Sequence, residues 1–205
     1  MHIPDGFLSV KVSAATWVIS LCGIALCLKK VTARLKDKMI PLMGVMSAFV
    51  FAAQMLNFPI FAGTSGHLLA SALASILLGP YAAAIVMTCV LVVQCFLFQD
   101  GGITALGANI LNMALVAAIG GYGVYSIAKK MTGIIVATAM AAWLSVVLAS
   151  SVCALELAAS GTVALTIVLP AMALAHALTG GIEAAVTCLI INFILKVRKD
   201  LLYKP

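Results

Sequence analysis

The chain alternates between long apolar runs and short polar breaks. Up to residue 159, the apolar runs cover 10–28, 40–58, 67–78, 81–98, 103–128 and 133–159. A hydrocarbon layer about 30 Å thick needs roughly 20 apolar residues per helical span. The run at 67–78 is shorter and stops at Gly79-Pro80. The pattern predicts a bundle of transmembrane helices.

The last apolar stretch, residues 162–197, is too long for one ordinary span. It contains Pro170 and the pair Gly180-Gly181, and both residue types interrupt helices. We therefore expect a break between Pro170 and Gly181. The stretch is predicted to form an outer-surface or re-entrant segment followed by a last span at 182–197, which gives about seven transmembrane helices.

The lysines and arginines predict how this bundle lies in the membrane. Cytoplasmic loops carry an excess of these residues. The basic clusters at 29–38, 129–130 and 196–204 all fall on one side of the predicted spans, and only Lys11 falls on the other. We therefore predict an all-α polytopic membrane protein with its N-terminus outside and its C-terminus in the cytoplasm.

Composition agrees with this class. The 205 residues are 64% hydrophobic and 9% charged, which is far outside the range of soluble domains. We expect one integral-membrane domain over 1–205, with an outer amino-terminal segment at 1–9 and a helical bundle at 10–197. The net charge of +6 is explained by the cytoplasmic loops and does not indicate nucleic acid. No signal peptide is evident, and the cysteines lie in apolar runs without a CxxC pair.

The polar start, Met1-His2-Ile3-Pro4-Asp5-Gly6, needs an explanation in such an apolar chain. A free amine followed by His at the second position is a chelator. The Met1 amine, the His2 backbone nitrogen and the His2 imidazole Nδ1 can close two rings on one metal ion. Planar nitrogen sites suit Ni(II) or Cu(II). The alternative is an ordinary frayed terminus.

Every histidine is predicted to lie on the outer side. His67 follows a Gly/Ser/Thr loop, and imidazole is a common metal ligand, so His67 is the candidate for the fourth position; helix capping is its alternative role. A polar belt is expected at the same depth, where it would support the ligands or form interhelical hydrogen bonds. Its members are Gln54, Asn57, Ser65, Gln94, Gln99, Asp100, Asn109 and Asn112.

Three further ionisable residues, Glu156, His176 and Glu183, fall in apolar runs. Ionisable groups in membrane segments are costly and are therefore functional candidates. We interpret them as a gate or as support for the site. A structural His176–Glu183 pair would explain two of them equally well.

Gly44, Ala48 and Ala52 recur every four residues and give the second span a small-residue face. Such a face permits close helix packing, either inside the bundle or with a partner helix. The sequence contains no GxxxxGK[ST] motif and no recognisable catalytic set. We therefore do not expect an enzyme.

Several segments resemble one known family. MHIPDGFLS at the start, FAAQMLNFP, GTSGHLL, LFQDGGITALGANILNM and the 176–183 stretch are similar to the NikM/CbiM proteins, and the nickel-type NikM in particular. These are the substrate-binding (S) components of energy-coupling-factor transporters for nickel and cobalt in prokaryotic cell membranes. The resemblance covers nearly the whole chain. One departure is Gly180-Gly181-Ile182 before Glu183, where the family often has Ile-Gly.

The resemblance implies a seven-span fold and a metal held by four nitrogens, namely the Met1 amine, both His2 nitrogens and the His67 imidazole. It implies Ni2+ or Co2+ as the transported ligand and no organic cofactor. It also implies partners: a membrane coupling (T) component, two ATPase subunits and often a small accessory membrane subunit. The small-residue face on the second span is similar to the surface that S components use for docking.

Two other functions remain open from the residues alone. A self-sufficient cation permease or channel would use Asp100, Glu156 and Glu183 as a relay. A purely structural subunit would bind no metal. Transport by the purified chain alone distinguishes the permease, and metal content distinguishes the structural subunit.

Overall fold

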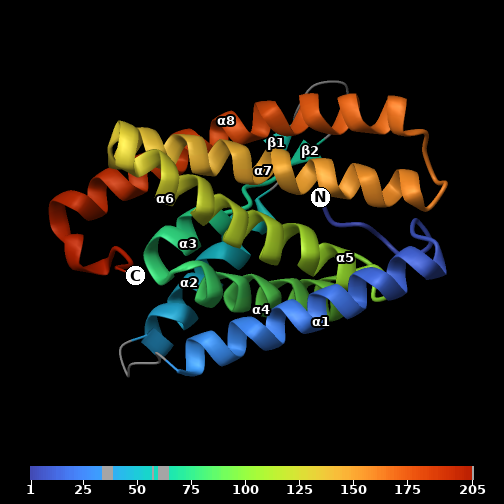
Figure 1. The fold of residues 1–205 in the computed structure, drawn as a ribbon, viewed down its shortest axis with the longest axis horizontal. Helices are drawn as coiled ribbons and strands as arrows, with labels where there is room; N and C mark the ends of the chain where they lie inside the picture. The colour runs from blue at the N-terminus through green and yellow to red at the C-terminus, as the bar shows by residue number, and fades with distance from the viewer. Residues whose placement is uncertain (34–38, 57, 60–64, 205) are drawn as a thin grey trace.

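The computed structural model describes residues 1–33, 39–56, 58–59 and 65–204, and the chain forms a helical bundle (Figure 1). Five helical runs are long and apolar enough to cross a membrane: α1 (Val10–Thr32), α4 (Pro80–Phe98), Leu106–Thr132, α7 (Ile134–Ala159) and α8 (Leu165–Val197). With the shorter α2 (Met39–Met55) and α3 (Ser71–Leu78), the described chain has seven helical segments. This confirms the predicted all-α membrane fold.

The run Leu106–Thr132 is continuous but not uniform. It consists of α5 (Leu106–Ile110), a π-helical stretch at Leu111–Gly120 and α6 (Gly121–Thr132), and a short 3-10 turn, Lys199–Leu201, follows α8. Two very short strands, β1 (Phe58–Pro59) and β2 (Ser65–Gly66), pair antiparallel before α3.

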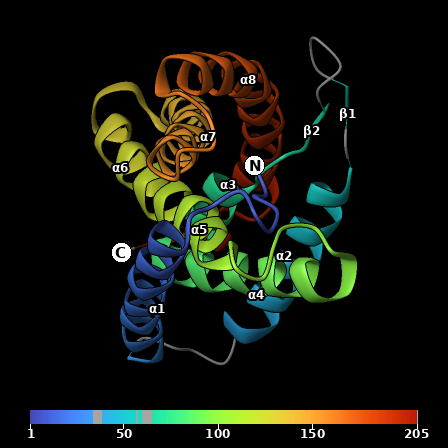
Figure 2. The ribbon, with the colours of Figure 1, turned by 90° about the vertical axis from the view of Figure 1, so that its right-hand side faces the viewer.

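The eight-residue helix α3 lies in the core. All of its residues are buried, and it packs against α4, α7 and the π-helical stretch. A helix that is apolar on every side is stable only when other elements surround it. Figure 2 shows α3 inside the bundle, with the start of the chain close to α3 and β2. The run predicted at 67–78 is therefore a buried helix preceded by an extended segment.

The predicted break before residue 182 is wrong. Residues Leu165–Val197 form one continuous helix, α8, with Pro170 inside it. Pro170 is near the start of α8, so it removes only one backbone N–H from an early turn, and membrane bundles accommodate such a loss. Gly180 serves helix packing instead: a Cβ there would lie 3.1 Å from the Trp143 ring of α7.

The lysines gather where the charge pattern predicted. Lys29 and Lys30 end α1, Lys129 and Lys130 end α6, and Lys196 ends α8. Figure 1 shows the carboxyl ends of these three helices at the same end of the bundle as the C-terminus. The first residues of the chain lie away from that end.

The contact between Gly180 and Trp143 gives a prediction for stability. A Gly180→Leu substitution should push α8 away from α7, because the new side chain meets the Trp143 ring and its carbonyl oxygen at 3.1–3.2 Å from the Cβ position. Overpacking of this kind costs roughly 1–3 kcal/mol. We expect the thermal unfolding temperature of the detergent-purified protein to fall by several degrees.

The control is the neighbouring Gly181→Leu substitution. Gly181 is exposed, and a Cβ there meets nothing within 4 Å. Its unfolding temperature should stay close to that of the unsubstituted protein. Equal destabilisation by both leucines would show that glycine flexibility, and not helix packing, matters at this point.

Candidate metal centre

The first residues of the chain fold into the bundle beside α5. The Ile3 N–H donates to the Asn109 side-chain oxygen at 2.8 Å, and the Asn109 amide donates back to the Ile3 carbonyl at 3.1 Å. The Gly102 N–H also donates to the Ile3 carbonyl, at 2.9 Å. Ile3 itself is only 3% exposed and packs with Ala105 and Ala108. Both the N–H and the C=O of Ile3 are thus hydrogen-bonded to residues of the bundle.

Asp5 provides a second attachment. Its carboxylate accepts from the Ile103 N–H at 3.1 Å and from the Thr104 N–H at 2.7 Å. The Thr104 hydroxyl and these backbone donors hold the pKa of Asp5 below its usual value, because they favour the charged form. The predicted outer segment at 1–9 is therefore bound to the turn that precedes α5.

Two glycines make this close approach possible. A Cβ on Gly102 would lie 2.2 Å from the Asp5 backbone nitrogen, so no other residue fits there without displacing the segment. Gly101 has φ +92° and would bring a Cβ within 2.8 Å of the Asn109 amide. Glycine tolerates both the close approach and the positive φ. The Gln99-Asp100-Gly101-Gly102 turn is thus shaped to receive the start of the chain.

The His2 ring lies between two polar side chains of α4 and the following turn. Its Nε2–H donates to Gln94 Oε1 at 3.2 Å, and its Nδ1 lies 3.3 Å from Asp100 Oδ1. The side chain is 6% exposed. Burial, together with the nearby Met1 amine, lowers the pKa of His2 to about 3, so the ring is neutral at physiological pH.

A neutral imidazole carries only one proton, and His2 has an acceptor near each ring nitrogen: Gln94 Oε1 near Nε2 and Asp100 Oδ1 near Nδ1. With Gln94 accepting from Nε2–H, the lone pair is on Nδ1, the nitrogen that the amino-terminal chelate requires. The Gln94 amide nitrogen is buried and has no partner among the described residues. This tautomer, with the proton on Nε2, is the one that a metal at Nδ1 would require.

His67 presents a second free nitrogen beside the first. The two imidazole centroids are 5.1 Å apart, with ring planes at 35°. His67 Nδ1–H donates to the Leu68 carbonyl at 3.0 Å, which leaves the lone pair on Nε2. That nitrogen is buried and has no hydrogen-bond partner in the described part of the chain. Burial, followed by the nearby amine and His2, lowers the pKa of His67 to about 3.

The Met1 amine completes the group of nitrogen bases. Burial lowers its pKa, and this effect outweighs the opposing influence of Cys153 and Asp100. Within residues 1–33, 39–56, 58–59 and 65–204, no three His, Cys, Asp or Glu side chains gather closely enough to hold a metal ion. A metal at this point would therefore need main-chain nitrogens in addition to the two imidazoles, and buried, uncharged nitrogens suit such an ion chemically.

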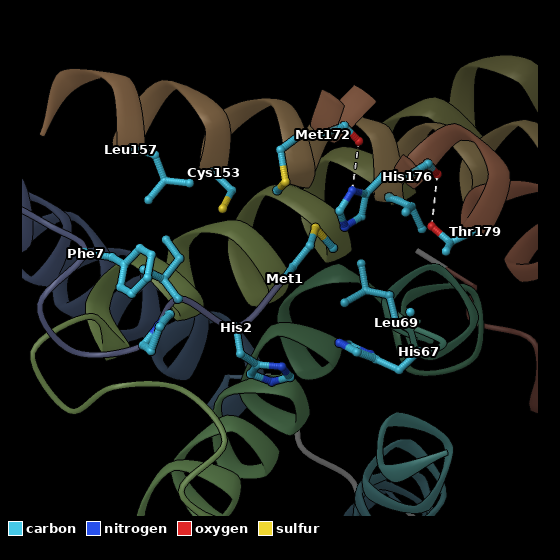
Figure 3. A pocket seen from close by; sticks show the side chains of 14 residues that line it. Met1, His2, Phe7, His67, Leu69, Cys153, Leu157, Met172, His176 and Thr179 are labelled. Carbon is cyan, nitrogen blue, oxygen red and sulfur yellow. Dashed lines mark hydrogen bonds between the residues drawn. The ribbon is translucent and has the colours of Figure 1, made fainter. Parts of the chain in front are cut away.

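A cavity of about 260 Å³ adjoins these nitrogens. Met1, His2 and His67 line one side, and Cys153, Met172 and His176 line the other. Figure 3 shows the side chains of both groups directed into the same space. His176 lies inside α8, and its Nδ1–H donates to the Met172 carbonyl at 2.8 Å.

Glu183 has a different position from that of His176. It is 2% exposed, and its two carboxylate oxygens accept from the Leu69 and Ala70 N–H groups at 2.8 and 2.7 Å. The Gln54 amide donates to the Leu69 carbonyl at 3.0 Å. His176 and Glu183 thus each bond to backbone, and not to one another in this structure.

The remaining candidates lie at several distances from the nitrogens. Glu156 accepts from Asn112 at 2.6 Å within the buried interior. Gln99 is exposed at the end of α4, Ser65 belongs to β2, and Asn57 falls outside the described residues. The small-residue face, formed by Gly44, Ala48 and Ala52, is exposed on α2.

The polar belt predicted from the sequence included Asn109, which binds Ile3, but not the other residues that receive the amino terminus. Gly101 and Gly102 form the turn, and Thr104 binds Asp5. Paired glycines directly after Asp100 are a usable signal, because glycine often marks close approach of another backbone. The cavity residues Cys153 and Met172 carried no such signal, since each lies in an ordinary apolar run.

Comparisons with known proteins identify the family of this chain. Residues 2–201 match the family described as CbiM, "Cobalt uptake substrate-specific transmembrane region". A protein of Archaeoglobus fulgidus named "Putative fused nickel transport protein NikMN" is 39% identical over 204 residues, which are 98% of this chain and 68% of that protein. "Cobalt transport protein CbiM" of Acetohalobium arabaticum is 37% identical over 135 residues, which are 64% of this chain and 53% of that protein.

A solved structure described as a truncated transition metal transporter has the same fold. Its TM-score is 0.89 at 34% identity, and the match covers 96% of this chain and 99% of the other. The matched family is thus one of transporter components. The chain therefore belongs to the CbiM family, and it is a multi-pass membrane protein whose relatives are nickel and cobalt transport proteins of bacteria and archaea.

Proposed function

We propose that this chain is the substrate-specific subunit of an ATP-driven transporter and captures Ni2+ or Co2+ at the outer face of the membrane. Four nitrogens would bind the ion: the Met1 amine, the His2 backbone nitrogen, His2 Nδ1 and His67 Nε2. The observation that carries the proposal is the buried Nε2 of His67, which has no hydrogen-bond partner among the described residues and lies beside the His2 ring. Buried polar atoms are nearly always bonded, and a metal would supply the missing partner.

The surrounding residues would act on the ligands and not on the metal. Gln94 would accept from His2 Nε2–H and so leave Nδ1 free for the metal, and Asn109 holds the backbone of Ile3 directly after the chelate. Asp100 lies beside His2 Nδ1 and adds a negative charge near the ion. Since copper would bind such nitrogens more tightly than nickel or cobalt, selectivity must come from the shape of the site and from metal supply.

The proposed energy source lies in partner proteins. The sequence has no P-loop, so a membrane coupling component and two ATPase subunits would complete the transporter, with a small accessory membrane subunit in some systems. The exposed Gly44, Ala48 and Ala52 on α2 are a candidate docking face for a helix of the coupling component. We expect the purified chain to bind metal without sustained transport.

The ligand set can be tested by changing the amino terminus. One alanine inserted between Met1 and His2 keeps every side chain but destroys the two-residue chelate. Metal content of detergent-purified protein should be about one nickel or cobalt per native chain. We expect almost none in a form with an amino-terminal tag and in His67→Ala, and altered loading in the alanine insertion, which can build a different chelate. Mass spectrometry of the native protein should find Met1 unblocked.

Two results would contradict this assignment. Equal loading in all forms would show that the metal is not held by the amino terminus and His67. Sustained cation uptake by the chain alone in liposomes would favour the permease, in which Asp100, Glu156 and Glu183 form the relay.

The pH dependence of binding follows from the buried bases. His2 and His67, with pKa values of about 3, need not lose protons near neutrality, and burial lowers the pKa of the Met1 amine. The His2 amide must lose its proton to bind. Affinity should therefore fall by at least about tenfold per pH unit on acidification from roughly pH 7 to 5.5. The free peptide Met-His-Ile-Pro-Asp-Gly should lose affinity more steeply, because its amine and imidazole titrate near ~8 and ~6.5.

Competition with a chromophoric chelator at several pH values measures both slopes. A protein slope as steep as that of the peptide would show that the bases are hydrated and protonated in the metal-free protein. A protein slope near zero would exclude the deprotonated amide as a ligand.

A test of the receiving turn uses Gly102→Ala. The added Cβ would lie 2.2 Å from the Asp5 nitrogen and should displace the amino-terminal segment. We expect nickel affinity to fall by about 10–100-fold, the range seen when groups that orient metal ligands are lost. Gly120→Ala is the control, because a Cβ there meets nothing within 4 Å. Unchanged affinity in Gly102→Ala would mean that metal binding does not depend on the close contact between Gly102 and the amino-terminal segment.

A further inference from the structure

The segment that carries His67 is attached to α8 by one side chain. Both oxygens of the buried Glu183 carboxylate accept from consecutive backbone N–H groups, those of Leu69 and Ala70. This bidentate arrangement fixes the plane of the carboxylate and the direction of the chain together. Charge-assisted bonds of this kind are stronger than bonds between neutral groups.

The attachment lies where the local sequence provides no support of its own. Ala70 precedes α3 with φ 59°, and its side chain makes no capping hydrogen bond. A left-handed alanine is strained and persists only when its surroundings determine it. Glu183 supplies that support from α8, and Gln54 of α2 supplies more by donating to the Leu69 carbonyl. A carboxylate near the start of a helix is also favourable for the helix dipole.

His67 is next to this attachment along the chain. Its Nδ1–H donates to the Leu68 carbonyl, so the ring is oriented by the backbone that Glu183 holds one residue later. The other proposed ligands are positioned separately: Met1 and His2 precede Ile3, which is bound to Asn109 and Gly102. Glu183 therefore acts on one of the two ligand-bearing segments.

We propose that Glu183 is the positioning residue for His67: through Leu69 and Ala70 it fixes where the imidazole Nε2 meets the metal, and it links that ligand to α8. This proposal rests on the ligand set given under the proposed function. It assigns the carboxylate a role that involves neither metal contact nor proton transfer. A shift of α8 would consequently move His67 relative to the amino-terminal chelate.

The test is a double-mutant cycle with Glu183→Gln and His67→Ala. The Gln side chain keeps one acceptor oxygen, but its NH2 group would face a backbone N–H and cannot accept a hydrogen bond from it. Nickel affinity, measured by competition with a chromophoric chelator, should fall by about 10–100-fold in Glu183→Gln. His67→Ala keeps the amino-terminal chelate, which should still bind added nickel weakly although it retains almost none through purification. In this background the same substitution should change affinity by less than about twofold, because the ligand that it positions is absent. The nickel absorption spectrum of Glu183→Gln should resemble that of His67→Ala.

Thr187→Val is the matched control, since Thr187 is buried one turn further along α8; it should leave affinity and spectrum unchanged. Glu183→Asp, which keeps the charge but shortens the reach, provides a second cycle if Glu183→Gln does not fold. The proposal is overturned if Glu183 substitutions weaken binding equally in both backgrounds, or do not weaken it at all. Equal binding by the native and His67→Ala proteins would instead overturn the ligand set itself, and the role of Glu183 with it.

Discussion

The candidate site depends on holding the first three residues of the chain inside the bundle. A chain terminus normally frays, since few contacts offset the conformational entropy of ordering it. Here the Ile3 backbone exchanges hydrogen bonds with Asn109 and accepts another from Gly102, while Asp5 binds the next turn. These bonds reach about a hundred residues along the sequence. Without them, Met1 and His2 would have no fixed relation to His67.

Burial of the nitrogens has a chemical consequence. An ammonium or imidazolium group is costly to remove from water, so burial favours the neutral form. The low pKa values of His2 and His67 express this effect. Neutral nitrogens with free lone pairs are ready to bind a metal, whereas buried carboxylates would have brought charge that needs a partner. The acids near the site are used differently: Asp5 and Glu183 bind backbone N–H groups.

Much of this architecture can be predicted from the sequence. Hydropathy predicted the positions of the long helices, and the lysines predicted which helix ends lie together. The break at Pro170 and Gly181 was predicted wrongly, because propensity alone does not show that α8 lies along α7 with Gly180 against Trp143. Tertiary packing overrides local preference at such positions.

The candidate site likewise combines residues that could be predicted from the sequence with contacts that only the structure shows. Met1 and His2 are candidates because chelation by consecutive residues is a local property of the sequence, and His67 is a candidate because it follows a Gly/Ser/Thr loop on the predicted outer side. Other contacts join residues about a hundred positions apart in the sequence: Gly102 binds Ile3, and Glu183 binds Leu69 and Ala70. No spacing rule connects such residues. Sequence analysis therefore identified Glu183 as a buried acid of interest but could not determine its partners.

The proposed ligand set separates what the sequence supplies from what the fold supplies. Three nitrogens come from two adjacent residues and would chelate a metal even in a peptide. The fold adds the His67 nitrogen and keeps water away. If water entered, the amine and the imidazoles would regain pKa values near ~8 and ~6.5, and protons would compete with the metal. Loss of His67 and hydration would thus weaken binding together, so one opening movement could release the ion without dismantling the chelate atom by atom.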